Sequence, residues 1–323
     1  MHSQQKKSAE RTQLLLWIVS VLFVFFSGCN AEVSTKPTPS SMIQTPSKIV
    51  PAPTDITSWA YWLSNPDAAQ LAKAPQQLIV MDYSADGSDE RRFSRDVLDY
   101  LHDHGKLVLS YMPVGEANSF RFYWKPDWAK NPPAFLGPEN PEWPEAYKVR
   151  YWDPAWRGTV LKPYLQRIVA AGFDGVYLDI VDGYWFWSEH GEDLQQAADR
   201  MAQLIVWTAD YARSLAHGRF LVCIQNGLGV FNDASPAWSR KLMRTIDMAA
   251  VESLFYNYYS EEDQAYRLSL LQQLAQNGKT LLDVEYIVPE LTGQYLKKIH
   301  DAPVRLIPYR AEPDRALDSL AGP

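Results

Sequence analysis

Residues 172–182 read Gly172-Phe173-Asp174-Gly175-Val176-Tyr177-Leu178-Asp179-Ile180-Val181-Asp182. A glycine that ends a helix leads into a short apolar run, and this run stops on the carboxylate of Asp179. The pattern is typical of a buried barrel strand that delivers an acid to the mouth of an active site. The alternative is a loop in which the aspartate caps the next helix. The rest of the chain favours the barrel strand.

Similar short apolar runs recur along the chain, at residues 59–63, 78–82, 107–112, 175–180, 220–225, 248–253, 280–284 and 304–309. Segments of helical periodicity lie between most of them, including apolar stripes at 97–101 and 160–169 and longer helices at about 194–215 and 261–276. Alternating helices and continuously apolar strands indicate a parallel sheet. Eight such strands in this length favour a closed α/β barrel, the (β/α)8 or TIM barrel, over a doubly wound sheet.

The interval from Pro113 to Phe173, between the third and fourth runs, is unusually long and partly rich in Trp, Pro and acidic residues. A structureless stretch of this length inside a compact domain is usually functional. We expect it to form much of one wall above the mouth of the barrel.

The composition is that of a globular protein with many aromatic residues. The chain has 323 residues, of which 46% are hydrophobic and 21% charged, which suits one large domain or two small ones. Its 12 Trp, 18 Tyr and 12 Phe residues fit a cleft that stacks on carbohydrate, although a large core also holds aromatic side chains. A net charge of −7 argues against nucleic acid as a partner, because nucleic-acid-binding proteins present basic stripes.

The first 29 residues have the pattern of a targeting segment. Basic residues precede an apolar run over 14–26, which is too short to span a bilayer as a mature helix. Phe26-Ser27-Gly28-Cys29 then resembles a bacterial lipobox, with Phe26 in place of the usual leucine. We expect a signal peptide at 1–28 and a lipid on Cys29, which makes the mature protein an exported, membrane-anchored lipoprotein. The alternative is secretory cleavage without a lipid.

Residues 29–56 combine repeated Pro with Ser and Thr, a composition that buries no core, and they are expected to form a tether. The folded domain is then 57–323, a length typical of a TIM barrel. Lipidation of Cys29 leaves Cys223 without a disulfide partner. Because Cys223 lies inside an apolar run, we interpret it as a buried thiol of the core and not as a nucleophile.

Polar residues stand at the ends of the predicted strands throughout: Asp82 and Tyr83, Tyr111 and Glu116, Asp179 and Asp182, Gln225 and Asn226, Glu252, Asp283 and Glu285, and Tyr309 and Arg310. In a barrel these ends converge on the face that holds the active site. We expect about half of the residues to be structural, paired with Arg121, Arg150 or Arg310.

Converging carboxylates and aromatic residues suit glycoside hydrolysis, in which one acid protonates the leaving oxygen and the other attacks the anomeric carbon or activates water. A metal site is disfavoured, because the chain has six His and neither a His-Glu-x-x-His nor a paired-Cys spacing. The Gly-Leu-Gly sequence at 227–229 lacks the remainder of a phosphate-binding loop, so nucleotide binding is also disfavoured.

Four motifs together resemble glycoside hydrolase family 114, the endo-α-1,4-polygalactosaminidase-like proteins. They are Val114-Gly115-Glu116-Ala117, Arg121-Phe122-Tyr123-Trp124, Tyr151-Trp152-Asp153 and the stretch from Gly172 to Asp179. The resemblance spans most of the region from Trp59 to Tyr309. It implies a TIM barrel, a galactosamine-containing polysaccharide as substrate, and no metal or organic cofactor.

The resemblance also implies roles for two carboxylates, with Asp179 as nucleophile and Glu252 as general acid/base. The second assignment rests mainly on strand order, and Glu116 and Glu285 are its competitors. Retention requires the two carboxyl groups to lie about 5–5.5 Å apart, and inversion about 6.5–9.5 Å. We expect a raised pKa on Glu252, caused by an apolar wall and by the charge of Asp179.

The remaining polar and aromatic residues are expected to bind substrate. Asp82, Glu116, Asp182 and Asp283 exceed what two-acid catalysis needs, so an acidic mouth is expected to attract a cationic, deacetylated chain. Stacking on sugar rings is assigned to Tyr83, Tyr111, Tyr123, Trp124 and Trp185, with burial in the core as the alternative. Arg121, Asn226, Glu285 and Tyr309 complete the expected substrate-binding set.

The function predicted from the sequence is an exported, monomeric glycoside hydrolase that makes endo cuts, with retention, in an amino-sugar-rich polysaccharide. The alternative from another class is a catalytically inactive barrel that binds envelope or biofilm glycan. Both need an aromatic cleft, but only the enzyme needs two opposed carboxylates with one of them protonated. A glycan deacetylase is disfavoured, because the usual metal ligands are missing.

Overall fold

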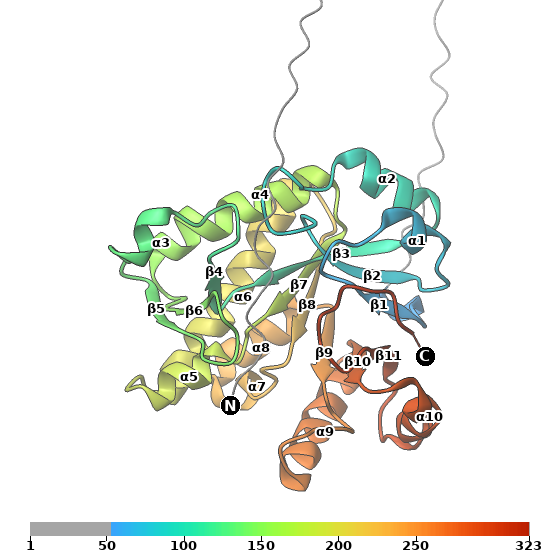
Figure 1. Ribbon diagram of the computed structural model, residues 1–323. Helices are drawn as coiled ribbons and strands as arrows, with labels where there is room; N and C mark the ends of the chain where they lie inside the picture. Colours follow the sequence, from blue (N-terminus) through green and yellow to red (C-terminus); the bar gives the residue numbers. More distant parts are fainter. Residues whose placement is uncertain (1–52, 323) are drawn as a thin grey trace, which may run out of the picture. The chain divides into compact units, whose positions relative to one another are not determined.

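Parallel strands form the centre of the computed structural model, which describes residues 53–322 (Figure 1). Eight of them make one sheet in the order β1-β2-β3-β7-β8-β9-β10-β11. Their bounds are β1 (Trp59–Tyr61), β2 (Leu78–Asp82), β3 (Leu107–Pro113), β7 (Gly175–Asp179), β8 (Leu221–Gln225), β9 (Met248–Glu252), β10 (Thr280–Tyr286) and β11 (Ile307–Ala311). The predicted signal peptide, Cys29 and most of the predicted tether lie outside the described residues.

The two end strands of the sheet, β1 and β11, meet through side chains and so nearly close the barrel. Nε1 of Trp59 donates to the carbonyl of Ile307 at 2.9 Å, and the rings of Trp59 and Tyr309 lie 5.5 Å apart. Pro308 lies within β11 and has no N–H to donate. This suits a strand at the edge of the sheet, which pairs with β10 on one side only. The predicted TIM barrel is therefore confirmed.

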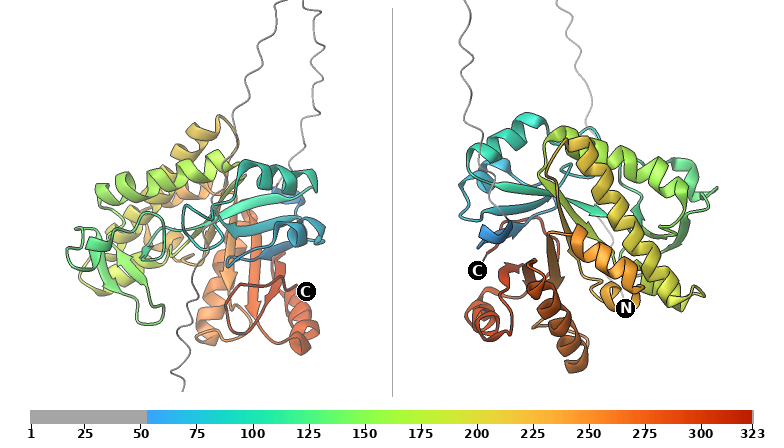
Figure 2. Two further views of the ribbon diagram at one scale, coloured as in Figure 1. Left: turned by 45° about the horizontal axis from the view of Figure 1, so that its top comes forward. Right: turned by 180° about the vertical axis from the view of Figure 1, so that it is seen from behind.

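Helices surround these strands on the outside (Figure 2). Their bounds are α1 (Ala68–Lys73), α2 (Arg95–Asp103), α3 (Pro154–Trp156), α4 (Lys162–Ala171), α5 (Gly183–Glu189), α6 (Leu194–Ala216), α7 (Val230–Asp233), α8 (Pro236–Thr245), α9 (Glu261–Gln276) and α10 (Thr292–Asp301). Gly172, at φ 97°, ends α4 in the left-handed conformation, as the opening motif predicts. None of the helices within 53–322 is long and apolar enough to cross a membrane.

Aromatic side chains fill the barrel interior beneath its mouth. Trp59 and Tyr61 of β1 have ring centroids 5.8 Å apart, and Tyr177 of β7 lies 5.3 Å from Tyr61. Along β7 the side chains alternate, so Tyr177 and Asp179 share the inner face. Asp179 therefore lies nearer the mouth of the barrel than Tyr177, directly above the layer of aromatic side chains.

The interval between β3 and β7 is not structureless, which corrects that expectation. It contains an antiparallel sheet in the order β4 (Glu116–Asn118), β6 (Ala146–Val149) and β5 (Leu136–Glu139), shown in green in Figure 1. Aromatic pairs hold the insertion together: Trp124 packs on Tyr147, and Phe135 packs on both Trp128 and Trp156. Contacts between residues far apart in the sequence thus stabilise this segment, although its sequence shows no helix or strand periodicity.

Cys223 lies in β8 and is fully buried, as predicted. Burial raises the pKa of its thiol well above the ordinary value, so the reactive thiolate is disfavoured.

Candidate active site

A cleft of about 680 Å³ opens at the C-terminal ends of the barrel strands. The long insertion lines one side of it, which confirms the expected wall, and the segment that follows β11 lines another. The sequence-predicted residues that the structure brings together in the lining are Asp82, Tyr111, Glu116, Arg121, Asp179, Asp182, Asn226 and Glu252.

Asp179 ends β7 with both carboxylate oxygens hydrogen-bonded. The hydroxyl of Tyr111, on the neighbouring strand β3, donates to Oδ2 at 2.7 Å, and the backbone N–H of Ile180 donates to Oδ1 at 2.7 Å. Ile180 has φ 59°, a left-handed conformation that is strained for a β-branched residue. A Cβ at Gly115 would collide with the carbonyl of Ile180, so the glycine makes room for this turn. The strained turn directs the amide back at the acid.

Glu252 ends β9 and is held from both neighbouring strands. Nδ2 of Asn226, just after β8, donates to Oε2 at 2.7 Å, and the hydroxyl of Tyr286 on β10 donates to Oε1. Oδ1 of Asn226 also accepts from the backbone N–H of Glu252 at 3.1 Å. Because the backbone donor fixes the orientation of this amide, its NH2 group must face Oε2.

Burial and the charge of Glu252 together raise the pKa of Asp179 to about 8. The hydrogen bonds from Tyr111 and Ile180 favour the carboxylate, but they are outweighed. The sequence predicts a raised pKa on Glu252, whereas in the structure the pKa of Asp179 is raised. Two such coupled acids hold one proton between them near neutral pH.

Two other acids of the cleft are paired with cations. Asp82 accepts from Nη2 of buried Arg121 at 2.7 Å, which confirms an expected ion pair. Glu116 is buried and accepts from Nζ of Lys148 at 2.5 Å and from Nδ2 of Asn140 at 2.9 Å. These partners neutralise the two carboxylates, so neither is a free anion in the cleft.

The other two arginines, Arg150 and Arg310, were expected to pair with the predicted strand-end acids but have other partners. Nη1 of Arg150 donates to the backbone carbonyls of Ala134 and Leu136, and Nη1 of Arg310 donates to Glu312 at 2.9 Å.

Asp182, in contrast, presents its side chain to the cleft. The residue precedes α5 and its side chain is accessible from the cleft, yet the protein around it desolvates the carboxylate and raises its pKa. The charge of Lys148 acts in the opposite direction. Asp182 is thus a carboxylate that a ligand in the cleft can reach.

Seven predicted substrate-binding residues are not brought to the cleft, which corrects their placement. Tyr83, Tyr123 and Tyr309 are buried in the core, where Tyr83 donates to the carbonyl of Gly87 and Tyr309 packs on Trp59. Trp124 packs within the insertion, and Trp185 is 49% exposed on α5 but does not line the cleft.

The other two, Asp283 and Glu285, are fully buried away from the cleft lining. They alternate along β10 with Val284 and Tyr286, and Tyr286 lines the cleft, so the two acids face outward beneath the helices. Oδ2 of Asp283 accepts from the hydroxyl of Tyr295 on α10, and Oε1 of Glu285 accepts from the N–H of Phe255. Glu285 is therefore removed as a competitor of Glu252.

Several residues of the cleft lining were not predicted from the sequence. Tyr286 was missed because the predicted strand stopped at Val284. Phe120 and Trp143 come from the insertion and are 46% and 51% exposed. The others include Tyr61, Lys148 and Arg315.

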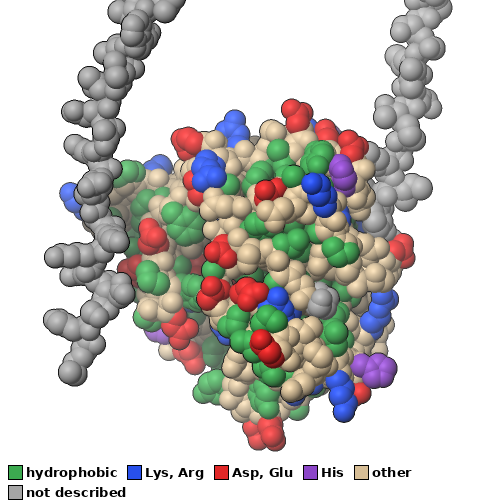
Figure 3. All heavy atoms as spheres, turned by 45° about the vertical axis from the view of Figure 1, so that its right-hand side comes forward, with side chains coloured by type: hydrophobic (Ala, Val, Ile, Leu, Met, Phe, Trp, Pro, Cys, Tyr) green, Lys and Arg blue, Asp and Glu red, His purple; other side chains and the backbone are tan. Residues whose placement is uncertain are grey.

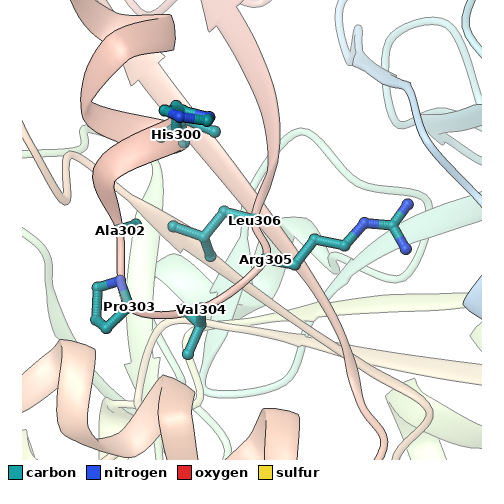
Figure 4. Close-up of a pocket in the computed structure, with 7 residues that line it drawn as sticks. His300, Ala302, Pro303, Val304, Arg305 and Leu306 are labelled. Carbon is teal, nitrogen blue, oxygen red and sulfur yellow. The ribbon is translucent and has the colours of Figure 1, made fainter.

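The rest of the described surface shows no second site of this kind. A shallow hollow between the end of α10 and the start of β11 lies at the opposite end of the strands (Figure 4). Among residues 53–322 no group of three or more His, Cys, Asp and Glu is arranged to hold a metal ion. On the face that Figure 3 shows, acidic, basic and apolar side chains of the described region are interspersed, without a continuous basic stripe.

Relatives by sequence cover most of the chain. An uncharacterized protein of Methanocaldococcus jannaschii is 38% identical over 271 residues, which are 81% of this chain and 77% of that protein. An uncharacterized protein of Thermotoga maritima is 30% identical over 321 residues, 95% of this chain and 92% of that protein.

Solved structures with the same fold include the glycoside hydrolase domain of PelA from Pseudomonas aeruginosa, with a TM-score of 0.61 and 17% identity over 82% of this chain and 98% of that one. Another is Aspergillus fumigatus Ega3 in complex with galactosamine, with a TM-score of 0.60 and 18% identity over 84% and 96%. The model of glycoside-hydrolase family GH114 matches residues 39–315. The chain is therefore a glycoside hydrolase that belongs to family GH114.

Proposed function

We propose that this glycoside hydrolase makes endo cuts in a galactosamine-containing polysaccharide, with retention, using Asp179 and Glu252. The observation that carries the proposal is the pair itself: the two acids end β7 and β9, on either side of β8, and both line one open cleft.

Glu252 is the proposed general acid/base, and its partners select the oxygen that carries the proton. Oε2 faces the NH2 group of Asn226, which has no lone pair to accept a proton. Oε1 faces the hydroxyl of Tyr286, which both donates and accepts. When Glu252 takes up the proton, it therefore takes it on Oε1, from which the proton passes to the glycosidic oxygen and to which it returns from the incoming water.

Asp179 is the proposed nucleophile and must be ionised when it attacks the anomeric carbon. In the free protein the shared proton favours Asp179, whose pKa is raised to about 8. An ammonium group of a bound amino sugar that lies nearer to Asp179 than to Glu252 favours the carboxylate of Asp179 over that of Glu252. Substrate binding thus shifts the proton to Glu252, which prepares both acids for their roles.

The substrate class is supported by the unpaired carboxylate of Asp182 and by the exposed rings of Phe120 and Trp143. The carboxylate offers a partner for an ammonium group, and the rings offer stacking faces for sugars. Ega3, which shares the fold, has been solved with galactosamine bound.

Export and anchoring through a lipid on Cys29 are proposed from the targeting pattern of residues 1–29, and a monomer is proposed for the folded domain. Mass spectrometry of the mature protein tests the anchor: a diacylglycerol on an N-terminal Cys29 is expected, and a mature chain that begins elsewhere would contradict it. Light scattering of the domain from residue 57 onward tests the monomer.

The first experiment incubates this domain with partly deacetylated α-1,4-linked galactosamine polymer and measures new reducing ends. Asp179→Asn and Glu252→Gln are the variants, and Glu285→Gln is the matched control, since that buried acid lies outside the cleft. Release by the parent and the control, but by neither variant, supports the proposal. Absence of release with binding intact would favour the glycan-binding alternative.

Two further measurements test the stereochemistry of the reaction and the contact of Asp182 with the ammonium group. Proton NMR of the first product distinguishes retention from inversion by its anomeric configuration. Asp182→Asn is expected to weaken binding of the deacetylated polymer but not of the fully acetylated one. An equal loss on both polymers would remove the ammonium contact from the proposal.

A further inference from the structure

The segment that follows β11, residues 312–322, forms a strap that is fastened to the barrel near the mouth. The carbonyl of Leu317 accepts from the N–H groups of Leu63 and Ser64, just after β1, at 2.8 and 3.0 Å. Further along, the N–H of Ala321 donates to the hydroxyl of Tyr309 at 3.1 Å. In Figure 1 this dark red segment runs back beside β1. The strap is therefore attached at two separate places.

Arg315 projects from the strap into the cleft lining. Its guanidinium carbon lies 4.9 Å from the ring centroid of Tyr286, and Nη2 lies 3.4 Å from the hydroxyl of Ser253. The backbone at Arg315 has φ 59°, which is uncommon outside glycine. Tyr286 in turn donates its hydroxyl to Oε1 of Glu252. A cation, an aromatic ring and the proposed acid/base thus form one chain of contacts.

The second carboxylate of the pair has the same arrangement. The guanidinium carbon of Arg121 lies 5.7 Å from the ring centroid of Tyr111, and Tyr111 donates to Asp179. Arg121 is buried and paired with Asp82, whereas Arg315 comes from an exposed strap. The repetition on opposite sides of the pair indicates that the contact of Arg315 is part of the site.

We propose that Arg315 is a positioning residue, which acts through Tyr286 to hold the hydroxyl of that tyrosine against Oε1 of Glu252. The proposal rests on the proposed function of Glu252 as acid/base. It assigns a catalytic contribution to a segment outside the barrel strands and to a residue that touches neither reacting acid.

The physical basis is the charge of the guanidinium over the ring face. A cation there stabilises negative charge on the phenol oxygen, which makes the hydroxyl a better hydrogen-bond donor. Burial and the charge of Glu252 raise the pKa of Tyr286 well above its ordinary value, and Arg315 opposes that rise. The cation also restrains the ring, so the hydroxyl keeps its direction toward Oε1.

Two double-mutant cycles on the domain from residue 57 onward test the proposal, one in activity and one in stability. The variants are Arg315→Gln, Tyr286→Phe, their combination and Arg315→Lys, with exposed Arg240→Gln on α8 as the matched control. Arginine, glutamine and lysine all carry an unbranched Cβ, so the cost of the left-handed backbone at position 315 is about the same in every variant.

In the kinetic cycle, Arg315→Gln is expected to lower kcat by about fivefold with KM little changed, and Arg315→Lys to restore most of the loss. The double variant is expected to match Tyr286→Phe alone, because the arginine has no effect without the hydroxyl. Additive effects on kcat, or a rise in KM alone, would show direct contact with substrate and would overturn the positioning role.

In the stability cycle, urea unfolding is expected to show coupling between positions 315 and 286 without any substrate. Its absence would overturn the contact itself. A parent that binds but does not cleave polymer, with this coupling intact, would count against the proposed function and not against the contact.

Discussion

The side-chain amide of Asn226 contacts Glu252 twice: Nδ2 donates to Oε2 at 2.7 Å, and Oδ1 accepts from the backbone N–H at 3.1 Å. Asn226 has φ 54°, a conformation that asparagine and aspartate tolerate better than most residues. The one residue therefore provides both the turn after β8 and the orientation of the acid on β9.

Asn226→Asp tests this contact with little added backbone strain. The substitution replaces a donor by a like charge beside Glu252, so we expect kcat to fall by about 100-fold. Initial rates on polymer measure the loss, and circular dichroism melting confirms that the fold is retained. A variant of normal melting temperature with parent activity would show that orientation by Asn226 is dispensable.

The coupled acids predict the pH dependence of the reaction. The pKa of Asp179 is about 8 in the free protein, so the pair loses its shared proton above that value and no acid remains to protonate the leaving oxygen. We expect kcat/KM to fall as pH rises through about 8. A profile that stays flat to about pH 10 would contradict a shared proton.

The same coupling makes a prediction that needs no substrate. Glu252→Gln removes the like charge that helps to raise the pKa of Asp179, while desolvation remains, so that pKa is expected to fall without reaching its ordinary value. Carbon NMR of labelled aspartate follows the titration directly, with Asp179→Asn to assign the signal. An unchanged titration in Glu252→Gln would place the cause in burial alone.

Stacking residues are predicted to be Phe120 and Trp143. Gly87 lies against the ring of Phe120, where a Cβ would lie 2.8 Å from the ring, and the side chain of Phe120 is 46% exposed at the cleft. We expect Phe120→Ala and Trp143→Ala each to raise KM by about fivefold with kcat little changed, since each removes about 1 kcal/mol of stacking. Initial rates over a range of polymer concentrations measure both constants.

Trp185→Ala is the matched control, because that tryptophan is equally exposed but lies outside the cleft lining. An effect on KM from Trp185→Ala, and none from the other two, would restore the assignment made from the sequence.

The strand that carries Asp179 was predictable because its signal is local. A helix-ending glycine, a short apolar run and a terminal acid occupy consecutive residues, and β7 begins and ends within one residue of the predicted limits. The same holds for β2, which matches its predicted bounds. Strand order alone then sufficed to place Glu252 in the same cleft.

The face of a strand was harder to predict when both faces are buried. All seven residues of β10 are buried, so the alternation of its acids with apolar residues does not show which face of the strand lines the barrel interior. Asp283 and Glu285 were placed in the cleft, although alternation with Tyr286 puts them on the outer face. If one residue of β10 were known to face the barrel interior, the alternation of side chains would have placed both acids on the outer face.

The insertion and the strap lie beyond local prediction for a different reason. Tyr147 meets Trp124, and Arg315 meets Tyr286, across long intervals of sequence. No periodicity marks such contacts, because each depends on where the completed barrel brings two distant segments together.

The outward acids Asp283 and Glu285 predict a pH-dependent stability that is separate from catalysis. Burial raises the pKa of Asp283 to about 7, and burial with the charge of Asp283 raises that of Glu285 to about 9. Both values exceed those of the unfolded chain, about 4, so the folded protein binds the protons more tightly. Their stabilising contribution is complete below about pH 4 and is lost as pH rises through 7 and 9.

Asp283→Asn removes one of these charges while its carbonyl oxygen still accepts from the hydroxyl of Tyr295. We expect the variant to match the parent at about pH 4 and to exceed its free energy of unfolding by about 4 kcal/mol at pH 9. Urea unfolding at several pH values measures the difference, with exposed Asp301→Asn on α10 as the control. If the parent and Asp283→Asn lost stability in parallel as pH rose, the outward pair would not be protonated in the folded protein, and the decline would have to originate at the cleft.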